Sequence, residues 1–486
     1  MTHSQTAAFR RRVRDHMQAP PVVVAEDLPA LEVVARMTEA RASAAVILEN
    51  ARVAGILTEQ DVTRRIAARP VEGRPIAELM TRPVATIRAD QPLYEAIGFM
   101  RRLGLRHMPV VDAKGGLCGM LYLRDVFAAA NPSLVAHIDQ LTHETTLAGL
   151  REVKAAQVRL AADLFADRVP APEILSLISH INNDIYRRVV QLNLEAMRDE
   201  SWGTPPVGFA VIVMGSGGRG ESFLFPDQDN GFILADYPDD EHGRIDPFFI
   251  ELAERMTAQM DQLGFPLCRG GVMANNPVWR KSASQWRQQV SAWIERPSVV
   301  AMQLCDILFD FQSVYGEREL TEQLRGMILA RIRANLGFLR QVFGVQAEHR
   351  AGLGWFNRLL KERDDPAHRG KVNLKYRGTL PLAEAVRLLA LRHGIAATGT
   401  LARIDALSAA GHLSRDEQDH LRGAFDHISG LQLRQQIADY QAGRPVSNYV
   451  DPVALTEREL DLLKTAFRAI NDFRTRLRSE LTGEIL

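Results

Sequence analysis

The chain has 486 residues, which is enough for two to four domains, and 46% of them are apolar and 24% charged, as in an ordinary globular protein. Lys+Arg and Asp+Glu are both 59, so no bulk charge favours binding to nucleic acid or to a membrane surface. The three cysteines are isolated, which excludes a zinc motif and a disulfide scaffold. No signal-peptide core or apolar span is apparent, so we expect a cytoplasmic protein without a membrane partner.

An internal repeat occupies residues 12–130. Pro29 and Met37 recur as Pro92 and Met100 at the same spacing, and the segment GILTEQD, which ends at Asp61, recurs as GMLYLRD, which ends at Asp125. Each copy predicts an extended entry, a helix, two strands joined by a turn and a closing helix. The expected unit is β-α-β-β-α, present twice.

This repeat resembles a tandem pair of CBS domains, and the strand entry RHMPVVD is typical of a second copy. The resemblance implies that the Gly-x-hydrophobic-Thr/Ser-x-x-Asp signature binds adenosine compounds such as AMP or ATP, through Thr58 and Asp61 in the first copy and through Asp125 in the second. Tyr122 stands where a small hydroxyl is usual, so at most one good nucleotide site is expected. The alternative is that Asp61 and Asp125 only cap the closing helices. A homodimer formed through the CBS pair is also implied by the resemblance.

The next segment, residues 131–200, is bounded by prolines and has apolar residues at helical spacing. We expect a helical connector here.

The stretch VIVMGSGGRGESFLFPDQDNGFIL, residues 211–234, is the strongest candidate for a functional site. An apolar strand ends in Gly215 and Ser216, Arg219 follows in a glycine-rich turn, and Asp227 and Asp229 precede a second apolar run. Alternate residues of an extended segment point the same way, so the two carboxylates would lie on one face, about 6 to 7 Å apart at the backbone. Paired carboxylates suit Mg²⁺, and a glycine-serine turn allows close approach to phosphate. A solvent-exposed turn is the alternative for this composition.

The order of strand, Gly-Ser turn, Arg and Glu, Asp-x-Asp and strand resembles the polymerase-β-like nucleotidyltransferases. Within them, the chain is most similar to the CBS-containing proteins of the DUF294 type, which are related to PII uridylyltransferases. The resemblance implies that Asp227 and Asp229 hold Mg²⁺ or Mn²⁺, that Gly215 and Ser216 hold the phosphates of an NTP, and that Arg219 assists.

The superfamily usually has a third carboxylate on a later strand. A helix is expected at residues 247–263 and a short strand from Phe265, but this region contains no acid. Asp306 and Asp310 are the next candidates, and a place on an amphipathic helix explains both equally well. Asn275, Asn276 and Arg280 are weaker candidates for nucleotide contacts.

Helical periodicity prevails from about residue 336 to the end. It resembles the helical substrate-binding domain that follows this nucleotidyltransferase family. Lys371, Lys375 and Arg377 are either ligands of a triphosphate or acidic substrate, or part of a solvated loop, which is the commoner role of a charge run.

The sequence thus predicts an α/β plus all-α protein with a tandem CBS pair (1–130), a helical connector (131–200), a polymerase-β-like nucleotidyltransferase domain with a mixed sheet (201–330) and a helical substrate-binding domain (331–486). The expected activity is Mg²⁺-dependent transfer of an NMP from an NTP to a hydroxyl. The resemblance alone implies a protein acceptor, as in PII uridylylation, and a CBS pair that senses adenine nucleotides. The alternative is a non-catalytic adenine-nucleotide sensor with a degenerate nucleotidyltransferase domain. Nucleic acid is not an expected partner.

Overall fold

The computed structural model describes residues 12–20, 22–66, 71, 73–103, 105–123, 144, 146–346 and 349–482. The chain divides into two compact units, Met1–His143 and Glu144–Leu486, and each is described by itself. Within the described residues, no helix combines the length and apolarity needed to cross a membrane.

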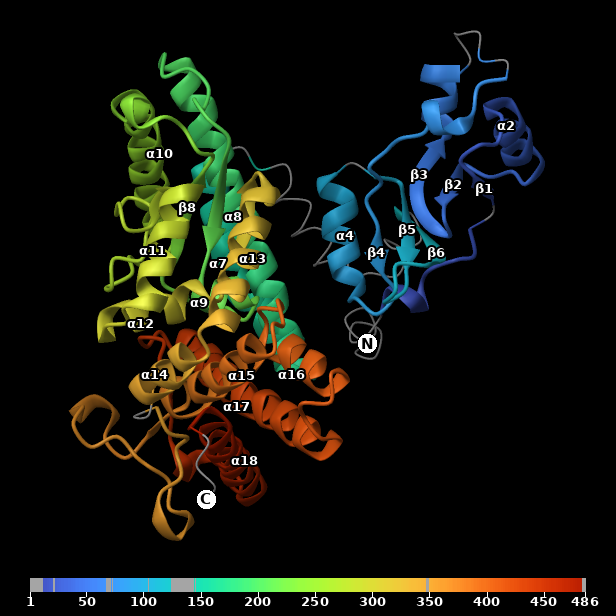
Figure 1. Cartoon of the computed structure of the whole chain (residues 1–486). Coiled ribbons are helices and arrows are strands. Elements are labelled where there is room, and N and C mark those ends of the chain that lie inside the picture. The colour runs from blue at the N-terminus through green and yellow to red at the C-terminus, as the bar shows by residue number, and fades with distance from the viewer. Residues whose placement is uncertain are drawn as a thin grey trace. The chain divides into compact units, whose positions relative to one another are not determined.

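The first unit contains two copies of one small sheet (Figure 1). In each copy the first two strands are parallel and the last two antiparallel. A helix follows the first strand of each copy, and its first turn begins next to a proline, which cannot continue a strand ladder. The elements are β1 (Val23–Ala25), α2 (Ala30–Glu39), β2 (Ala44–Glu49) and β3 (Arg52–Thr58), then β4 (Ile87–Arg88), α4 (Leu93–Arg102), β5 (His107–Val111) and β6 (Leu117–Tyr122).

The repeat predicted from the sequence is therefore confirmed from the entry strand to the last strand of each copy. The two sheets pack on each other through a small apolar cluster that contains Val46, Ile56, Met120 and Tyr122. The first copy continues into a short helix, α3 (Glu59–Asp61), while the corresponding segment of the second copy lies outside the described residues.

The second unit is built on a four-stranded mixed sheet in the order β10 (Gln312–Gly316), β7 (Phe209–Val213), β8 (Asn230–Leu234), β9 (Arg280–Ser282). β7 is antiparallel to both β10 and β8, and β8 is parallel to β9. Every residue of β7 and β8 is buried, because helices cover the sheet. This explains why β7 and the last three residues of β8 are continuous apolar runs.

Helices surround this sheet and form a second layer below it in Figure 1. α8 packs on α10 and α17, so the helices expected as a connector are an integral part of the second unit. Side-chain caps fix several starts, as where Ser414 accepts a hydrogen bond from the Glu417 amide in the first turn of α17. The helices are α7 (Leu147–Ala166), α8 (Ala171–Asp199), α9 (Gly215–Arg219), α10 (His242–Gln262), α11 (Ala283–Glu295), α12 (Val299–Leu308), α13 (Arg318–Ala334), α14 (Gly337–Val345), α15 (Leu380–Arg392), α16 (Thr400–Ala409), α17 (Arg415–Gln441) and α18 (Glu457–Thr482).

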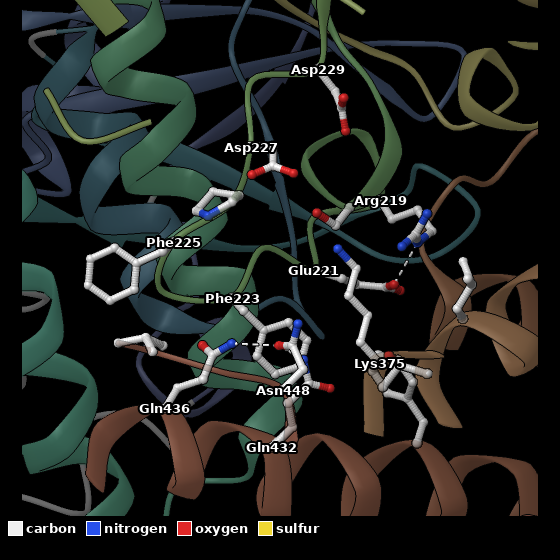
Figure 2. A pocket seen from close by; sticks show the side chains of 16 residues that line it. Arg219, Glu221, Phe223, Phe225, Asp227, Asp229, Lys375, Gln432, Gln436 and Asn448 are labelled. Atoms are coloured by element: carbon white, nitrogen blue, oxygen red, sulfur yellow. Dashed lines mark hydrogen bonds and ion pairs between the residues drawn. The ribbon is translucent and has the colours of Figure 1, made fainter. Parts of the chain in front are cut away.

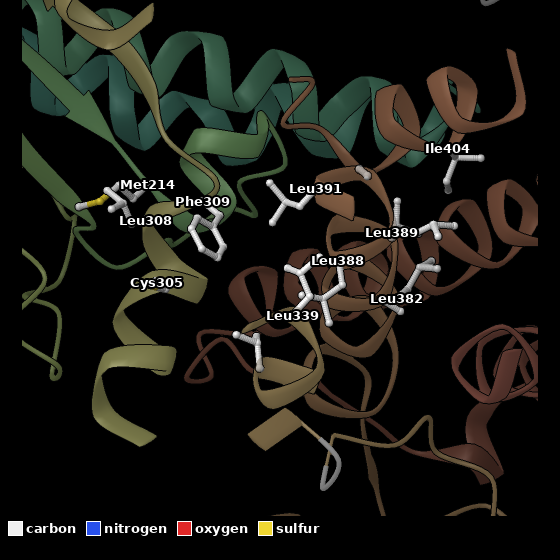
Figure 3. Packing of buried hydrophobic residues seen from close by; sticks show 14 of the residues in the cluster. Met214, Cys305, Leu308, Phe309, Leu339, Leu382, Leu388, Leu389, Leu391 and Ile404 are labelled. Atoms are coloured by element: carbon white, nitrogen blue, oxygen red, sulfur yellow. The ribbon is translucent and has the colours of Figure 1, made fainter. Parts of the chain in front are cut away.

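One apolar core joins the sheet to the helical layer. It runs from Met214 at the end of β7 through Phe309 after α12 to Leu388 and Leu391 on α15 and Ile404 on α16 (Figure 3). The nucleotidyltransferase and helical domains expected from the sequence consequently share their core.

The short strand expected from Phe265 is absent, and the chain forms a loop until β9 begins at Arg280. Pro266 lacks an N–H for a ladder, and Gly271 has a positive φ of 66°. The loop still follows the sheet, because the carbonyl oxygens of Pro266 and Val272 accept hydrogen bonds from the amides of Gln228 and Asn230.

Candidate functional site

A cavity of about 210 Å³ lies between the loops that follow β7 and the helical layer. The sheet side contributes Ser216, Asp227 and Asp229, and the helical side contributes Lys375 and Gln432. Figure 2 shows the two acids at one end of the cavity and the amide side chains of α17 at the other.

The two acids lie in the extended segment immediately before β8, as the sequence predicted. Gln228 between them is fully buried and points away, because its Nε2 donates to the carbonyl oxygens of Thr257 and Phe265, both at 3.0 Å. Alternation in an extended segment then turns Asp227 and Asp229 to the opposite side, where both line the cavity. The expectation that their carboxylates share one face is confirmed.

Asp229 is held against the glycine turn. A Cβ added at Gly215 would lie 2.9 Å from Asp229 Oδ2, and Gly215 has a positive φ of 56°, so a side chain there would be strained and crowded. Burial raises the pKa of Asp229 to about 6, although a hydrogen bond with Cys268 and the charge of Lys375 oppose this rise. A cation near this carboxylate would favour its charged form.

Arg219 lines the cavity, but its guanidinium is already engaged. Its Nε lies 2.8 Å from Glu221 Oε2, and its Nη1 lies 2.8 Å from Asp310 Oδ2. Glu221 in turn accepts hydrogen bonds from the amide and the hydroxyl of Thr400 at the start of α16. Arg219 thus ties the glycine turn to the helical layer, and its expected assistance to phosphate is not apparent in these contacts.

Gly218 explains why this turn must be so rich in glycine. A Cβ at Gly218 would lie 1.6 Å from the backbone oxygen of Asp310, so no other residue fits without a shift of the backbone. α9 spans only the five residues Gly215–Arg219, because Gly220 follows with a positive φ of 71° and caps the end of the helix in the left-handed conformation.

Neither candidate for the third carboxylate reaches the acid pair. Asp310 is fully buried and contacts three guanidinium groups: Arg219, and Arg387 and Arg403 at 2.6 Å each. Burial alone would raise the pKa of Asp310, but the three arginines hold it well below its usual value. Asp306 is paired with Arg387.

Arg280, considered above as a nucleotide ligand, is also buried and pairs with Asp246 at 3.0 Å. Asn276 is used within its own loop, where its side chain bonds the Gly271 carbonyl and the Val278 amide. Across the described ranges of the chain, no group of three or more His, Cys, Asp or Glu side chains is placed to hold a metal ion.

Lys375 is the member of the basic run that lines the cavity; Lys371 and Arg377 do not. Figure 2 shows its side chain rising from the helical layer toward the acids. The sequence did not indicate three amides that also line the cavity, Gln432, Gln436 and Asn448. No local pattern marks them, because two lie on a long helix and the third lies on a loop beside it.

In the CBS unit, Thr58 caps α3, and Asp61 returns the bond: its Oδ2 accepts from the Thr58 amide at 3.0 Å and from the Thr58 hydroxyl at 2.7 Å. Asp61 also accepts from the Thr81 hydroxyl at 3.1 Å. In this structure, Asp61 therefore serves the start of the helix in the first copy, as the capping alternative predicts. Tyr122 is buried, with its ring edge against His107, and Asp125 lies outside the described residues.

A mixed sheet with an Asp-x-Asp pair, a glycine turn and a helical layer that closes the cavity defines this second unit as a nucleotidyltransferase domain. Family models agree. The model described as "Putative nucleotidyltransferase DUF294" matches residues 155–299, and that of the "Putative nucleotidyltransferase substrate binding domain" matches residues 337–481. The CBS domain model matches residues 13–68 and 76–131. The chain belongs to the DUF294 nucleotidyltransferase proteins that carry a CBS pair.

Individual relatives match shorter stretches. An uncharacterized 17.7 kDa protein of Acidianus ambivalens is 29% identical over 22% of this chain and 65% of its own length. An uncharacterized protein of Methanopyrus kandleri is 30% identical over 23% of this chain and 58% of its own. The A-adding tRNA nucleotidyltransferase of Aquifex aeolicus is 27% identical over 25% of this chain and 15% of its own. The chain thus spans less than two thirds of each of these relatives.

Solved structures with CBS domains match about a quarter of the chain. A CBS domain protein from Pyrobaculum aerophilum, complexed with AMP, is 26% identical over 26% of this chain and 98% of its own, with a TM-score of 0.24. A CBS domain protein from Thermoplasma acidophilum is 22% identical over 28% of this chain and 78% of its own, with a TM-score of 0.25.

Proposed function

We propose that this protein transfers a nucleoside monophosphate from an NTP to a hydroxyl group, with Asp227 and Asp229 as the metal-holding acids. The observation that carries the proposal is their convergence on one cavity with Ser216 and Lys375, in a domain of nucleotidyltransferase type. In this reaction the hydroxyl oxygen bonds to the α-phosphorus, the bond from that phosphorus to the bridging oxygen breaks, and pyrophosphate leaves. The hydroxyl proton is released. The resemblance to PII uridylyltransferases favours a hydroxyl on a protein as the acceptor.

The acid pair fits Mg²⁺ or Mn²⁺ bound together with a triphosphate. Mg²⁺ commonly takes one or two carboxylates and completes its shell with water and phosphate oxygens, so two acids are sufficient for binding. Asp227 is exposed, whereas Asp229 is half-buried and desolvation raises its pKa, so a bound cation would favour its charged form. When bound, the ion would neutralise charge that develops on the transferred phosphate.

The other residues at this end bind and orient the triphosphate. The hydroxyl of Ser216 can donate to a phosphate oxygen, and the Lys375 ammonium supplies a positive charge from the helical side. Because Gly215 has no side chain, the Asp229 carboxylate can lie directly against the glycine turn. Such positioning and charge neutralisation account for most of the catalysis in phosphoryl transfer.

The test is pyrophosphate release and transfer of label from each of the four NTPs, with Mg²⁺ or Mn²⁺ and cell lysate as the source of acceptor. We expect Asp227→Asn and Asp229→Asn to lose at least about 100-fold in rate, the size of effect typical for groups that stabilise a transition state. Asp236→Asn is the matched control, because Asp236 follows the far end of β8 and bonds Arg287 on the surface. If the wild type binds nucleotide but transfers no label with any combination of NTP and metal ion, the proposal that the protein is an enzyme is refuted.

That outcome would favour the second candidate, a non-catalytic nucleotide sensor. The specific observation behind it is that Asp310 is occupied by three arginines. The third carboxylate that lines the cavity, Glu221, is likewise engaged by Arg219 and Thr400. A sensor would bind NTP with metal, and Asp227→Asn would weaken that binding without any activity to lose.

We further propose that the CBS pair binds AMP or ATP in its first copy. The support is the signature that ends at Asp61 together with the match to the CBS domain model. Calorimetry on the full chain should show that Asp61→Asn weakens AMP or ATP binding more than Tyr122→Ala, since the Tyr122 phenol is already packed between the sheets. Equal binding by wild type and Asp61→Asn would remove this role.

A further inference from the structure

A cluster of three amides, of which Gln432 and Gln436 are buried and Asn448 is half-buried, forms the end of the cavity opposite the acids (Figure 2). The Asn448 Oδ1 accepts from Gln432 Nε2 at 2.8 Å and from Gln436 Nε2 at 2.9 Å. Gln436 Oε1 accepts from the amide of Leu224 at 3.2 Å. Both functional ends of Gln436 are therefore used, and this residue holds the loop beside the acids onto α17.

Gln432 differs from Gln436 in one respect. It is 1% exposed, and among the described residues its Oε1 has no hydrogen-bond partner. Because its Nε2 is fixed by Asn448, the oxygen cannot turn to a partner without losing that bond. A buried acceptor without a donor costs roughly 1 to 3 kcal/mol, and native structures seldom leave one unsatisfied.

The residues that line the cavity with Gln432 suit a flat, partly polar ligand. Phe223, Phe425 and Leu380 line the same cavity, so apolar faces stand beside the amides. Aromatic faces and a few fixed polar groups are the usual means of binding and orienting a planar ring. The acids and Lys375 place negative phosphates at the other end, so the ring system of a nucleotide would extend toward the amides.

We propose that Gln432 is the nucleobase-binding residue of this site, with its Oε1 accepting a hydrogen bond from a ring or exocyclic N–H of the base. This assignment rests on the proposed nucleotidyltransferase function, whose acids it complements. Gln436 and Asn448 are positioning residues, because they fix the Gln432 amide and the loop. A site with one unpartnered acceptor discriminates among bases by whether each presents an N–H at that point.

The test compares ligands with and without a base. Binding of the four NTPs and of inorganic tripolyphosphate, each with Mn²⁺, is measured by calorimetry on the full chain. Gln432→Met keeps the length of the side chain and removes its polar atoms. Gln435→Met is the matched control: it makes the same change on the same helix, where the amide donates to Asp439 at 2.9 Å outside the cavity.

We expect Gln432→Met to weaken the best NTP about 10-fold, which corresponds to about 1.4 kcal/mol, and to narrow the differences among the four NTPs. Tripolyphosphate should bind both variants as it binds the wild type. Equal weakening of NTP and tripolyphosphate would show a merely structural role and overturn the assignment, as would unchanged NTP binding. If tripolyphosphate binds and no NTP binds more tightly, the nucleobase assignment is refuted and the proposed phosphate site is retained. If neither binds, the proposed function fails with it.

Discussion

Asp310→Asn tests whether this acid is structural or catalytic. The substitution keeps the shape of the side chain but removes the charge that faces Arg219 at 2.8 Å and Arg387 and Arg403 at 2.6 Å. Arg219 keeps Glu221 as a partner and Arg387 keeps Asp306, but Arg403 loses its carboxylate. Removing one partner of a buried ion pair typically costs 3 to 5 kcal/mol, so we expect a loss of at least about 3 kcal/mol in the free energy of unfolding.

Urea unfolding followed by tryptophan fluorescence measures this loss. All tryptophans of the chain lie in the second unit, and Trp279 and Trp286 are buried in its core, so the signal reports that unit alone. Asp405→Asn is the control, because Asp405 pairs with Arg422 at the surface, where such pairs contribute about 0 to 1 kcal/mol. A loss below about 1 kcal/mol for Asp310→Asn, matching the control, would refute the reasoning. A stable but inactive variant would restore Asp310 as a catalytic candidate.

The same variant has a pH signature. The arginines hold the folded pKa of Asp310 below its unfolded value, so its stabilisation is fully present above the unfolded pKa of about 3.9 and is lost as the pH falls below it. Asp310→Asn should therefore be less sensitive than the wild type to acid below about pH 4.

Two further predictions concern other buried groups. Burial lowers the pKa of Lys154 to about 7, so the unfolded chain binds this proton more tightly than the folded chain does. The free energy of unfolding should therefore rise between about pH 7 and 10. Lys154→Met should reduce that rise, as measured by urea unfolding at a series of pH values. An equal slope in both proteins would contradict it. Gly218→Ala should lower the melting temperature and weaken tripolyphosphate binding, because its Cβ would clash with a backbone oxygen. Gly326→Ala is the control: it lies in open space on α13 and should stabilise the protein by up to about 1 kcal/mol. Similar effects of both substitutions would refute the packing argument.

Features set by neighbouring residues were predictable from the sequence. The CBS repeat was visible because each copy carries its own strands and turns, and the acid pair was visible because Asp227 and Asp229 are adjacent to a buried strand. The strand expected from Phe265 was wrong because an apolar start was given more weight than Pro266, which cannot join a ladder.

Features set by distant residues were not predictable. The partners of Asp310 come from a glycine turn, α15 and α16, and no spacing along the chain relates them. Gln432 is one of several glutamines on α17, and only packing against Asn448 distinguishes it from Gln435, which faces the surface side of the same helix. Burial, a property of the folded state, separates the two.

The three-arginine contact of Asp310 has a consequence for how the helical layer is held. Arg219 comes from the glycine turn, and Arg387 and Arg403 come from the helical layer. Separating the layer from the turn would break a buried ion pair, which typically costs about 3 to 5 kcal/mol. The contact at Asp310 therefore holds the helical layer firmly against the glycine turn. Away from this contact, Phe225 in the lining of the cavity is 40% exposed, and its ring stacks on that of Tyr440 with the centroids 6.1 Å apart.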